Sequence, residues 1–459
     1  MNKRIKFLIS AVLIFAIFVS SFIMPAASYE TDVETSTADM LLINIDTNTV
    51  VFSQKPDNMW YAGYLSELVT FLVAYEMIDR PEETTFKVES SFASSLPISD
   101  GSLNQFVGTE LTALDLMAIM LLTSGNDAAY ALADLAADGD RTVFVDAMNE
   151  KIEILGCENT GFVSPGYDST SDQYTTCRDL YTIYMEVLKN DFFHDVMDAD
   201  PLCYIPPSLM NAEDEEANEQ YTVYPEASIL NEKSPYYFRY VNDAKYSYTE
   251  ATYANLVLTT TYRGKSYFFA GLLGKTDSEE NVYADARKLT TWAYLNLSDR
   301  KMINAEEAMT DVTVTADWGE YPVELHPFNS AFKTVPNDYD ESKLSYEFDI
   351  PESVKTPIAA GQSAGRAKLI YDGDEIDDIQ LIVNTDEGLD MMPDIGRFTT
   401  YVYRHLMPYQ LPTEPDVSDN SEKDKKKSEE TKEPEKSDNT EEAETKSETK
   451  ASEPKATEG

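Results

Sequence analysis

A long apolar stretch of helical spacing, broken once by three small polar residues, constrains this fold more than any other feature. Residues 111–156 include LTALDLMAIMLLTSGNDAAYALADLA and, further on, TVFVDAMNEKIEILG. Apolar side chains recur in both at the spacing of a helix face. Ser124-Gly125-Asn126 interrupts the run and predicts a turn between two helices.

Strand-like and helix-like segments surround this helical unit. The predicted strands lie at 40–46, 50–53, 252–262 and 266–273, and the predicted helices at 62–79, 176–188 and 281–297. Helices that interrupt an antiparallel sheet predict an α+β domain, here at residues 29–300. Residues 204–234 are polar and acidic and contain three prolines, so a surface insertion is expected there.

The two ends of the chain differ from its body. Three cations precede an apolar run at residues 7–24, and small residues follow it, which is the layout of a signal peptide over residues 1–28. The apolar run is long for a signal, so an uncleaved membrane anchor is the alternative. In both cases the body of the protein is expected outside the cytoplasm.

The pattern of apolar and polar residues changes again beyond residue 300. Short alternating runs such as DVTVTADW and AKLIYDGDEIDDIQLIV predict a small all-β domain at residues 301–408. Residues 409–459 are almost wholly Lys, Glu, Asp, Ser, Thr and Pro, a composition that predicts a disordered tail.

The net charge of −46 excludes some partners. The tail contributes −7 and the signal segment +3, so the remaining body carries −42. An acidic surface repels phosphate backbones, so no nucleic acid is expected as a partner. Membrane contact is expected only if the signal segment stays uncleaved.

Cysteine and histidine give no sign of a metal site or a cofactor. The three cysteines are Cys157, Cys177 and Cys203, which allow one disulfide at most and form no CxxC motif. The three histidines lie far apart in the sequence. We therefore expect neither metal nor cofactor.

Four long segments of the chain are LDLMAIMLLTSGNDAAYALADLA, FVDAMNEKIEILGCENTGFVSPGY, GLLGKTDSEENVYADARKLTTWAY and TPIAAGQSAGRAKLIYDGDEIDDIQLIV. Together they resemble the serine-type D-alanyl-D-alanine carboxypeptidases, the low-molecular-weight penicillin-binding proteins. The resemblance covers residues 38–404 and implies a transpeptidase-like domain, an antiparallel sheet plus a helical subdomain, followed by a β domain. It also implies a cell-wall location and peptidoglycan stem peptides or wall enzymes as partners.

The family's chemistry rests on the motifs S-x-x-K, S-x-N and K-T-G, and the first is altered in this chain. Thr70, Ala74 and Glu76 align without a gap to the family pattern, which places Tyr64 in the serine slot and Glu67 in the lysine slot. A serine hydroxyl needs a neighbouring base, which a lysine one helical turn later supplies. A bulky phenol with a pKa of about 10 is no substitute for that hydroxyl.

The second motif is intact and the third is altered. Ser124 and Asn126 fill the second, where the resemblance implies a hydroxyl for proton transfer and an amide that holds substrate. The third aligns with a strand expected to start at Lys245, with the threonine replaced and Ser247 in the glycine slot. A glycine there would let a ligand approach the backbone closely.

Other matches to these motifs are expected to be chance. Gly274-Lys275-Thr276 lacks the earlier glycine of a phosphate-binding loop. S-x-x-K strings begin at Ser298, Ser330, Ser447 and Ser452, and none opens a buried helix.

The altered motifs favour a catalytically deficient homologue that binds peptidoglycan or scaffolds wall enzymes. Glu67 and Lys245 are predicted to pair across the former active site, which leaves its charge near zero where the family has two lysines. Two alternatives stay open, namely an active serine carboxypeptidase that trims stem peptides and a structural spacer that binds nothing.

Overall fold

The computed structural model describes residues 29–96, 101–167, 173–199, 202–211, 218–250, 252–272, 280–316, 319–355, 358 and 361–383. The predicted signal peptide, the predicted tail and the end of the predicted β domain lie outside these ranges. The chance motif match at residues 274–276 also lies outside these ranges.

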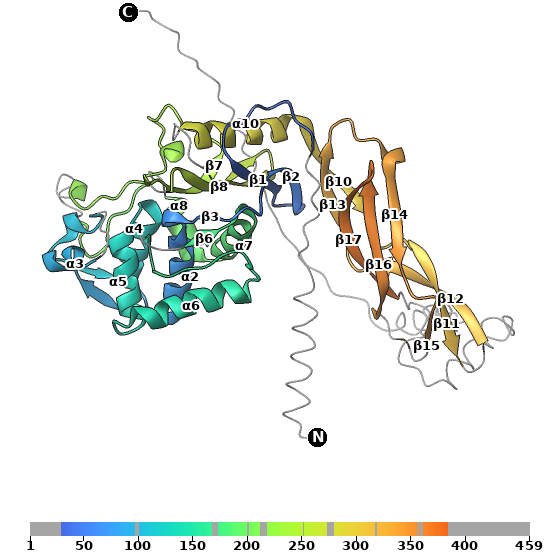
Figure 1. The fold of residues 1–459 in the computed structure, drawn as a ribbon, viewed down its shortest axis with the longest axis horizontal. Coiled ribbons are helices and arrows are strands. Elements are labelled where there is room, and N and C mark those ends of the chain that lie inside the picture. The colour runs from blue at the N-terminus through green and yellow to red at the C-terminus, as the bar shows by residue number, and fades with distance from the viewer. Residues whose placement is uncertain are drawn as a thin grey trace, which may run out of the picture. The chain divides into compact units, whose positions relative to one another are not determined.

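A five-stranded antiparallel sheet in the order β2-β1-β9-β8-β7 organises the first part of the chain (Figure 1). Its strands are β1 (Asp39–Asn44), β2 (Thr49–Gln54), β7 (Val241–Ser247), β8 (Asn255–Tyr262) and β9 (Lys265–Leu272). The prediction that β7 starts at Lys245 is wrong. Pairing with β8 begins at Val241, so Lys245 lies near the end of the strand.

The two faces of this sheet support two separate cores. Leu41 and Ile43 of β1 point into a core shared with the helical subdomain, and Met40 and Leu42 point into the opposite core. This alternation follows from the two-residue period of a strand. Helix α10 (Glu280–Asn296) covers the second face, and the helical subdomain covers the first (Figure 1).

The helical subdomain confirms the predicted turn at residues 124–126. Its main helices are α2 (Glu67–Met77), α4 (Ala113–Leu122), α5 (Asn126–Ala136), α6 (Arg141–Ile154), α7 (Cys177–Val187) and α8 (Asp191–Met197). The helix predicted at 62–79 opens instead with a 3₁₀ turn, η1 (Gly63–Ser66). Helix α4 begins with a capping box, in which Thr112 and Asp115 satisfy each other's backbone N–H groups.

Short elements complete this part of the chain. They are α3 (Ser90–Ser94), η2 (Asn104–Phe106), η3 (Ser228–Leu230), the pair β3 (Trp60–Tyr61) with β6 (Tyr174–Thr175), and the pair β4 (Thr85–Lys87) with β5 (Glu110–Thr112).

The predicted surface insertion at 204–234 is less external than its composition suggested. Val223 and Ile229 are buried, one in each of the two cores. Tyr204 exchanges backbone hydrogen bonds with Val223 and donates its hydroxyl to the Asp115 carboxylate at 2.7 Å. Apolar contacts therefore hold the segment against the rest of the domain. Its many polar residues made these contacts hard to predict from composition.

Residues 297–383 are all β in their described part, as predicted. Strands β10 (Leu297–Ile303) and β13 (Ala331–Pro336) form one pair. A six-stranded sheet contains β14 (Leu344–Asp349), β16 (Ser363–Tyr371), β17 (Asp374–Val383), β12 (Gly319–Pro327), β11 (Thr310–Ala316) and β15 (Ser353–Lys355), in that order. A short 3₁₀ turn, η4 (Glu341–Lys343), precedes β14. Within the described ranges, no helix has the length and apolar character needed to cross a bilayer.

Candidate functional site

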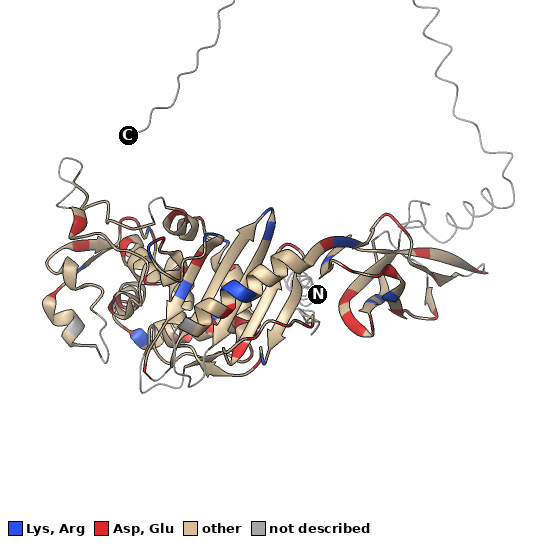
Figure 2. Cartoon of the chain, turned by 90° about the horizontal axis from the view of Figure 1, so that it is seen from above, with Lys and Arg blue, Asp and Glu red and all other residues tan. Residues whose placement is uncertain are grey.

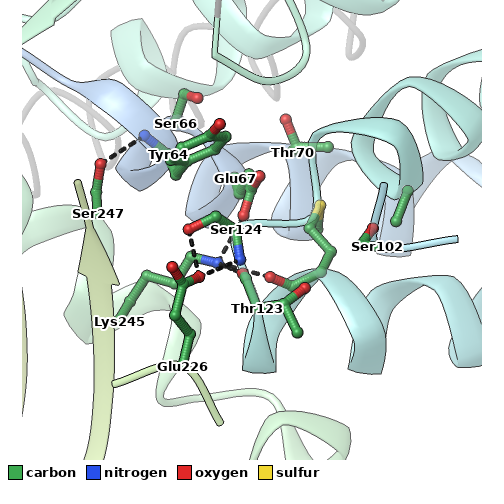
Figure 3. Close-up of polar contacts among 12 residues, drawn as sticks. Tyr64, Ser66, Glu67, Thr70, Ser102, Thr123, Ser124, Glu226, Lys245 and Ser247 are labelled. Carbon is green, nitrogen blue, oxygen red and sulfur yellow. Dashed lines mark hydrogen bonds and ion pairs between the residues drawn. The ribbon is translucent and has the colours of Figure 1, made fainter. Parts of the chain in front are cut away.

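The residues predicted from the three motifs meet at one place. Figure 3 shows Tyr64 in η1, Glu67 at the start of α2, Ser124 in the turn between α4 and α5, and Lys245 and Ser247 near the end of β7. Every one of these side chains is buried, with exposed fractions of 8% or less. Asn126, also predicted, is fully buried at the first position of α5.

The predicted pairing of Glu67 with Lys245 is confirmed. Lys245 Nζ lies 2.6 Å from Glu67 Oε2, and the side chains are 3% and 0% exposed. A buried charge without a partner is strongly destabilising, so each of these two groups depends on the other.

Lys245 also completes the C-terminal end of α4. Its ammonium donates to Met120 O at 2.6 Å and to Thr123 O, two carbonyls that the helix itself leaves unsatisfied. A cation at a helix C-terminus also interacts favourably with the helix dipole. An ammonium has three protons, and in this arrangement all three are used inside the protein.

Glu226, which the sequence did not indicate, binds the serine of the second motif. Its Oε2 accepts hydrogen bonds from Ser124 Oγ at 2.5 Å and from Ser124 N at 2.8 Å (Figure 3). Its own backbone N–H donates to Leu122 O at 2.8 Å, another free carbonyl at the end of α4. Only the fold brings it here, since 102 residues separate it from Ser124.

The expected near-zero charge of the site is therefore wrong. Glu67 and Lys245 cancel, but the carboxylate of Glu226 adds a further negative charge next to Ser124. The formal sum over these three groups is −1. The error arose because a charge from the insertion could not be assigned to the site from the sequence.

The ring and the backbone N–H of Tyr64 each contact a neighbouring residue. Its ring packs on that of Tyr167 with centroids 5.2 Å apart, and its backbone N–H donates to Ser247 Oγ at 2.9 Å. The preceding residue, Gly63, has a φ of 57°, and any Cβ there would collide with Ser247 Oγ. Ser247 thus fills the space that a glycine at its position would leave open.

Comparison with known proteins assigns the family. The model of the D-alanyl-D-alanine carboxypeptidase family, peptidase S11, matches residues 26–269, more than half of the chain.

The chain belongs to this carboxypeptidase family.

Individual relatives cover most of the chain at low identity. D-alanyl-D-alanine carboxypeptidase DacA of Haemophilus influenzae is 23% identical over 402 residues, which are 84% of this chain and 94% of the relative. DacF of Bacillus subtilis is 20% identical over 377 residues, which are 82% of this chain and 92% of the relative.

Solved structures support the fold. Penicillin binding protein 5 from Haemophilus influenzae superposes with a TM-score of 0.60 at 20% identity, covering 78% of this chain and 99% of that one. Penicillin binding protein 6B from Escherichia coli gives a TM-score of 0.54 at 17% identity, covering 77% and 97%. This likeness shows the α+β transpeptidase-like fold followed by a β domain.

The carboxypeptidase family's motifs can be compared with this geometry directly. Acyl transfer by a serine needs a hydroxyl beside a base and N–H donors for the developing oxyanion. At the position predicted for the serine this chain has a phenol packed on Tyr167, and the N–H of Tyr64 already donates to Ser247. Glu67, predicted to stand in place of the lysine, is paired with Lys245.

Two of the chance S-x-x-K matches lie among the strands that follow α10, and neither opens a helix. Ser298 belongs to β10, and Ser330 directly precedes β13. Ser447 and Ser452 lie outside the described residues.

The cysteines are free thiols in the structure, so the disulfide that the sequence allowed does not form. Burial raises the pKa of Cys157 to about 12 and also raises the pKa of Cys177. Among the described residues, no group of three or more His, Cys, Asp or Glu could hold a metal ion.

Proposed function

We propose that this chain is an extracytoplasmic member of the D-alanyl-D-alanine carboxypeptidase family that forms no acyl-enzyme and acts at the cell wall by binding. Family membership supports the location and a cell-wall ligand. The predicted signal layout at residues 1–28 supports export.

The Glu67–Lys245 pair is the observation that carries this proposal. In the family's first motif, a lysine accepts the proton of the serine. Here Lys245, the lysine that the described residues bring to the site, is buried, paired with a carboxylate at 2.6 Å and bound to the end of α4. Its three N–H groups donate to Glu67, Met120 and Thr123, so in this arrangement the ammonium offers no position at which to accept the proton of a hydroxyl.

Labelling with a fluorescent penicillin tests the absence of acyl-enzyme chemistry. The mature chain is incubated with the label beside an active family member, denatured, and analysed by gel fluorescence and peptide mass spectrometry. We expect a labelled band for the active relative and none for this chain. A covalent adduct on any serine of the native chain would establish the competing reading, an active carboxypeptidase.

Tyr64→Ser gives a matched control for the role of the lysine slot. The substitution restores the hydroxyl but leaves Glu67 paired with Lys245, so we expect labelling to remain absent. Labelling of Tyr64→Ser alone would mean that the ion pair does not block activation.

Sedimentation with purified peptidoglycan separates a binding protein from a spacer. We expect the mature chain to co-sediment and to be released by soluble wall fragments. A chain that remains wholly in the supernatant would favour the structural spacer.

A further inference from the structure

The hydrogen-bond donors at this site are already used within the protein. The ammonium of Lys245 has three internal acceptors, and both the N–H and the hydroxyl of Ser124 point to Glu226. The N–H of Tyr64 points to Ser247. A ligand carboxylate, or an acyl oxygen, needs such donors and would have to break these bonds to obtain them.

The same site contains a hydrogen-bond acceptor, the Oε1 atom of Glu226. Glu226 is solvent-exposed, and the hydrogen bonds that its carboxylate accepts from the described residues all involve Oε2. In the described part of the chain, no side chain donates to Oε1 and no Lys or Arg lies within ion-pair distance of Glu226. Because Ser124 holds the other oxygen through two bonds, the carboxylate is oriented before any ligand arrives.

The negative charge of the site and its aromatic residues also favour a cationic ligand. The formal charge over Glu67, Lys245 and Glu226 is −1, and the chain as a whole carries −46. Tyr64 and Tyr167 pack on each other and each retain 8% exposure. Aromatic rings attract cations through their negative faces.

We propose that this site has changed its preference from carboxylate to ammonium, and that Glu226 binds a primary ammonium group on a peptide side chain. The proposal deepens the proposed function and rests on it for the identity of the site. Glu226 is the residue that determines this specificity. It accepts the hydrogen bonds of both Ser124 donors, and it supplies the oxygen that accepts from the ammonium group. Its ligand would be a cationic peptide rather than one recognised through a terminal carboxylate.

A pair of probes that differ only in charge tests this. Ligand-observed NMR titrations of the mature chain at low salt compare Nα-acetyl-lysine methylamide with its Nε-acetylated counterpart. We expect the ammonium probe to bind at least about tenfold more tightly, as charge-assisted hydrogen bonds exceed neutral ones. Equal affinity for both probes, or no binding of either, would overturn the proposal.

Substitutions in the insertion locate the binding. Glu226→Gln keeps the shape and removes the charge, so affinity for the ammonium probe should fall at least about tenfold. Glu219→Gln is the matched control, an exposed glutamate of the same segment whose carboxylate accepts a hydrogen bond from Tyr224 at 3.4 Å. It should change affinity by less than about twofold. The proposal is wrong if the two variants behave alike.

Two further readouts keep the result interpretable. Raising the salt should weaken ammonium binding by the native chain, which needs no variant at all. If instead Glu226→Gln gains affinity for N-acetylalanine while the native chain binds neither lysine probe, Glu226 is an internal plug and the ammonium proposal fails. Penicillin labelling is independent of these titrations, so an adduct would refute the proposed function without deciding the ligand preference.

Discussion

Lys245 is tied into the local structure by every proton of its ammonium. Lys245 is 2% exposed, and its ammonium pairs with Glu67 and donates to carbonyls at the end of α4. Lysine at this position is therefore needed by the local structure whether or not a ligand binds. Glu67, in turn, is tolerated at 0% exposure because that ammonium compensates its charge.

A double-mutant cycle measures this dependence. Lys245→Met and Glu67→Leu should each lower the free energy of unfolding by about 3–5 kcal/mol, since each leaves one buried charge unpaired. The double variant should cost less than the sum of the two, by about 2 kcal/mol or more. It should still cost something, because Met120 and Thr123 lose their donor. Strict additivity in urea unfolding would show that the pair is not coupled.

At the scale of elements, α10 fixes the segment that follows the predicted signal peptide. Asp285 is fully buried on this helix. Its Oδ2 accepts from the N–H and hydroxyl of Ser36 at 2.8 and 3.2 Å and from those of Thr37 at 2.7 and 2.8 Å. One carboxylate thus accepts from four donors and fixes the backbone directly before β1.

Removing this carboxylate should release the segment. Asp285→Ala should lower the free energy of unfolding by about 3 kcal/mol, because buried donors lose a charged acceptor. Hydrogen exchange of residues 29–38 should become faster than in the native chain. Arg287→Ala, an exposed position on the same helix, is the control and should change stability by less than about 0.5 kcal/mol. Unchanged protection in Asp285→Ala would contradict the assignment.

At the scale of the whole molecule, acidic residues greatly outnumber basic ones. Figure 2 shows Asp and Glu spread along the described parts of the chain, with Lys and Arg between them. The sequence has 82 acidic residues against 36 basic ones. Such an excess keeps a protein soluble but opposes its compact state through self-repulsion.

Salt should therefore stabilise this protein. Raising NaCl from about 0.02 to about 0.3 M shortens the screening length well below the dimensions of the molecule. We expect the thermal midpoint to rise by about 2 °C or more, because weakened repulsion outweighs the loss of a few exposed ion pairs such as Arg80–Glu83. Calorimetry in NaCl checks this, as chloride is less excluded from protein surfaces than sulfate. A midpoint that is constant or falls would contradict it.

The sequence by itself determined the class of fold and predicted the departures at the family's motifs. Apolar periodicity located the main helices and strands, and the ungapped register of the helix after Gly63 placed Tyr64 and Glu67. These are local properties, since spacing along one element specifies which side chains share a face. The Glu67–Lys245 pair followed from two such registers and from opposite charge.

Only the tertiary structure decided what completes the site. Glu226 contacts Ser124 because Val223 and Ile229 anchor an acidic segment in the two cores, and Ser247 meets the N–H of Tyr64 because Gly63 allows β7 to approach closely. Contacts between segments a hundred or more residues apart depend on packing and chain direction, which no local pattern records. The sign of the charge at this site is therefore a property of the fold.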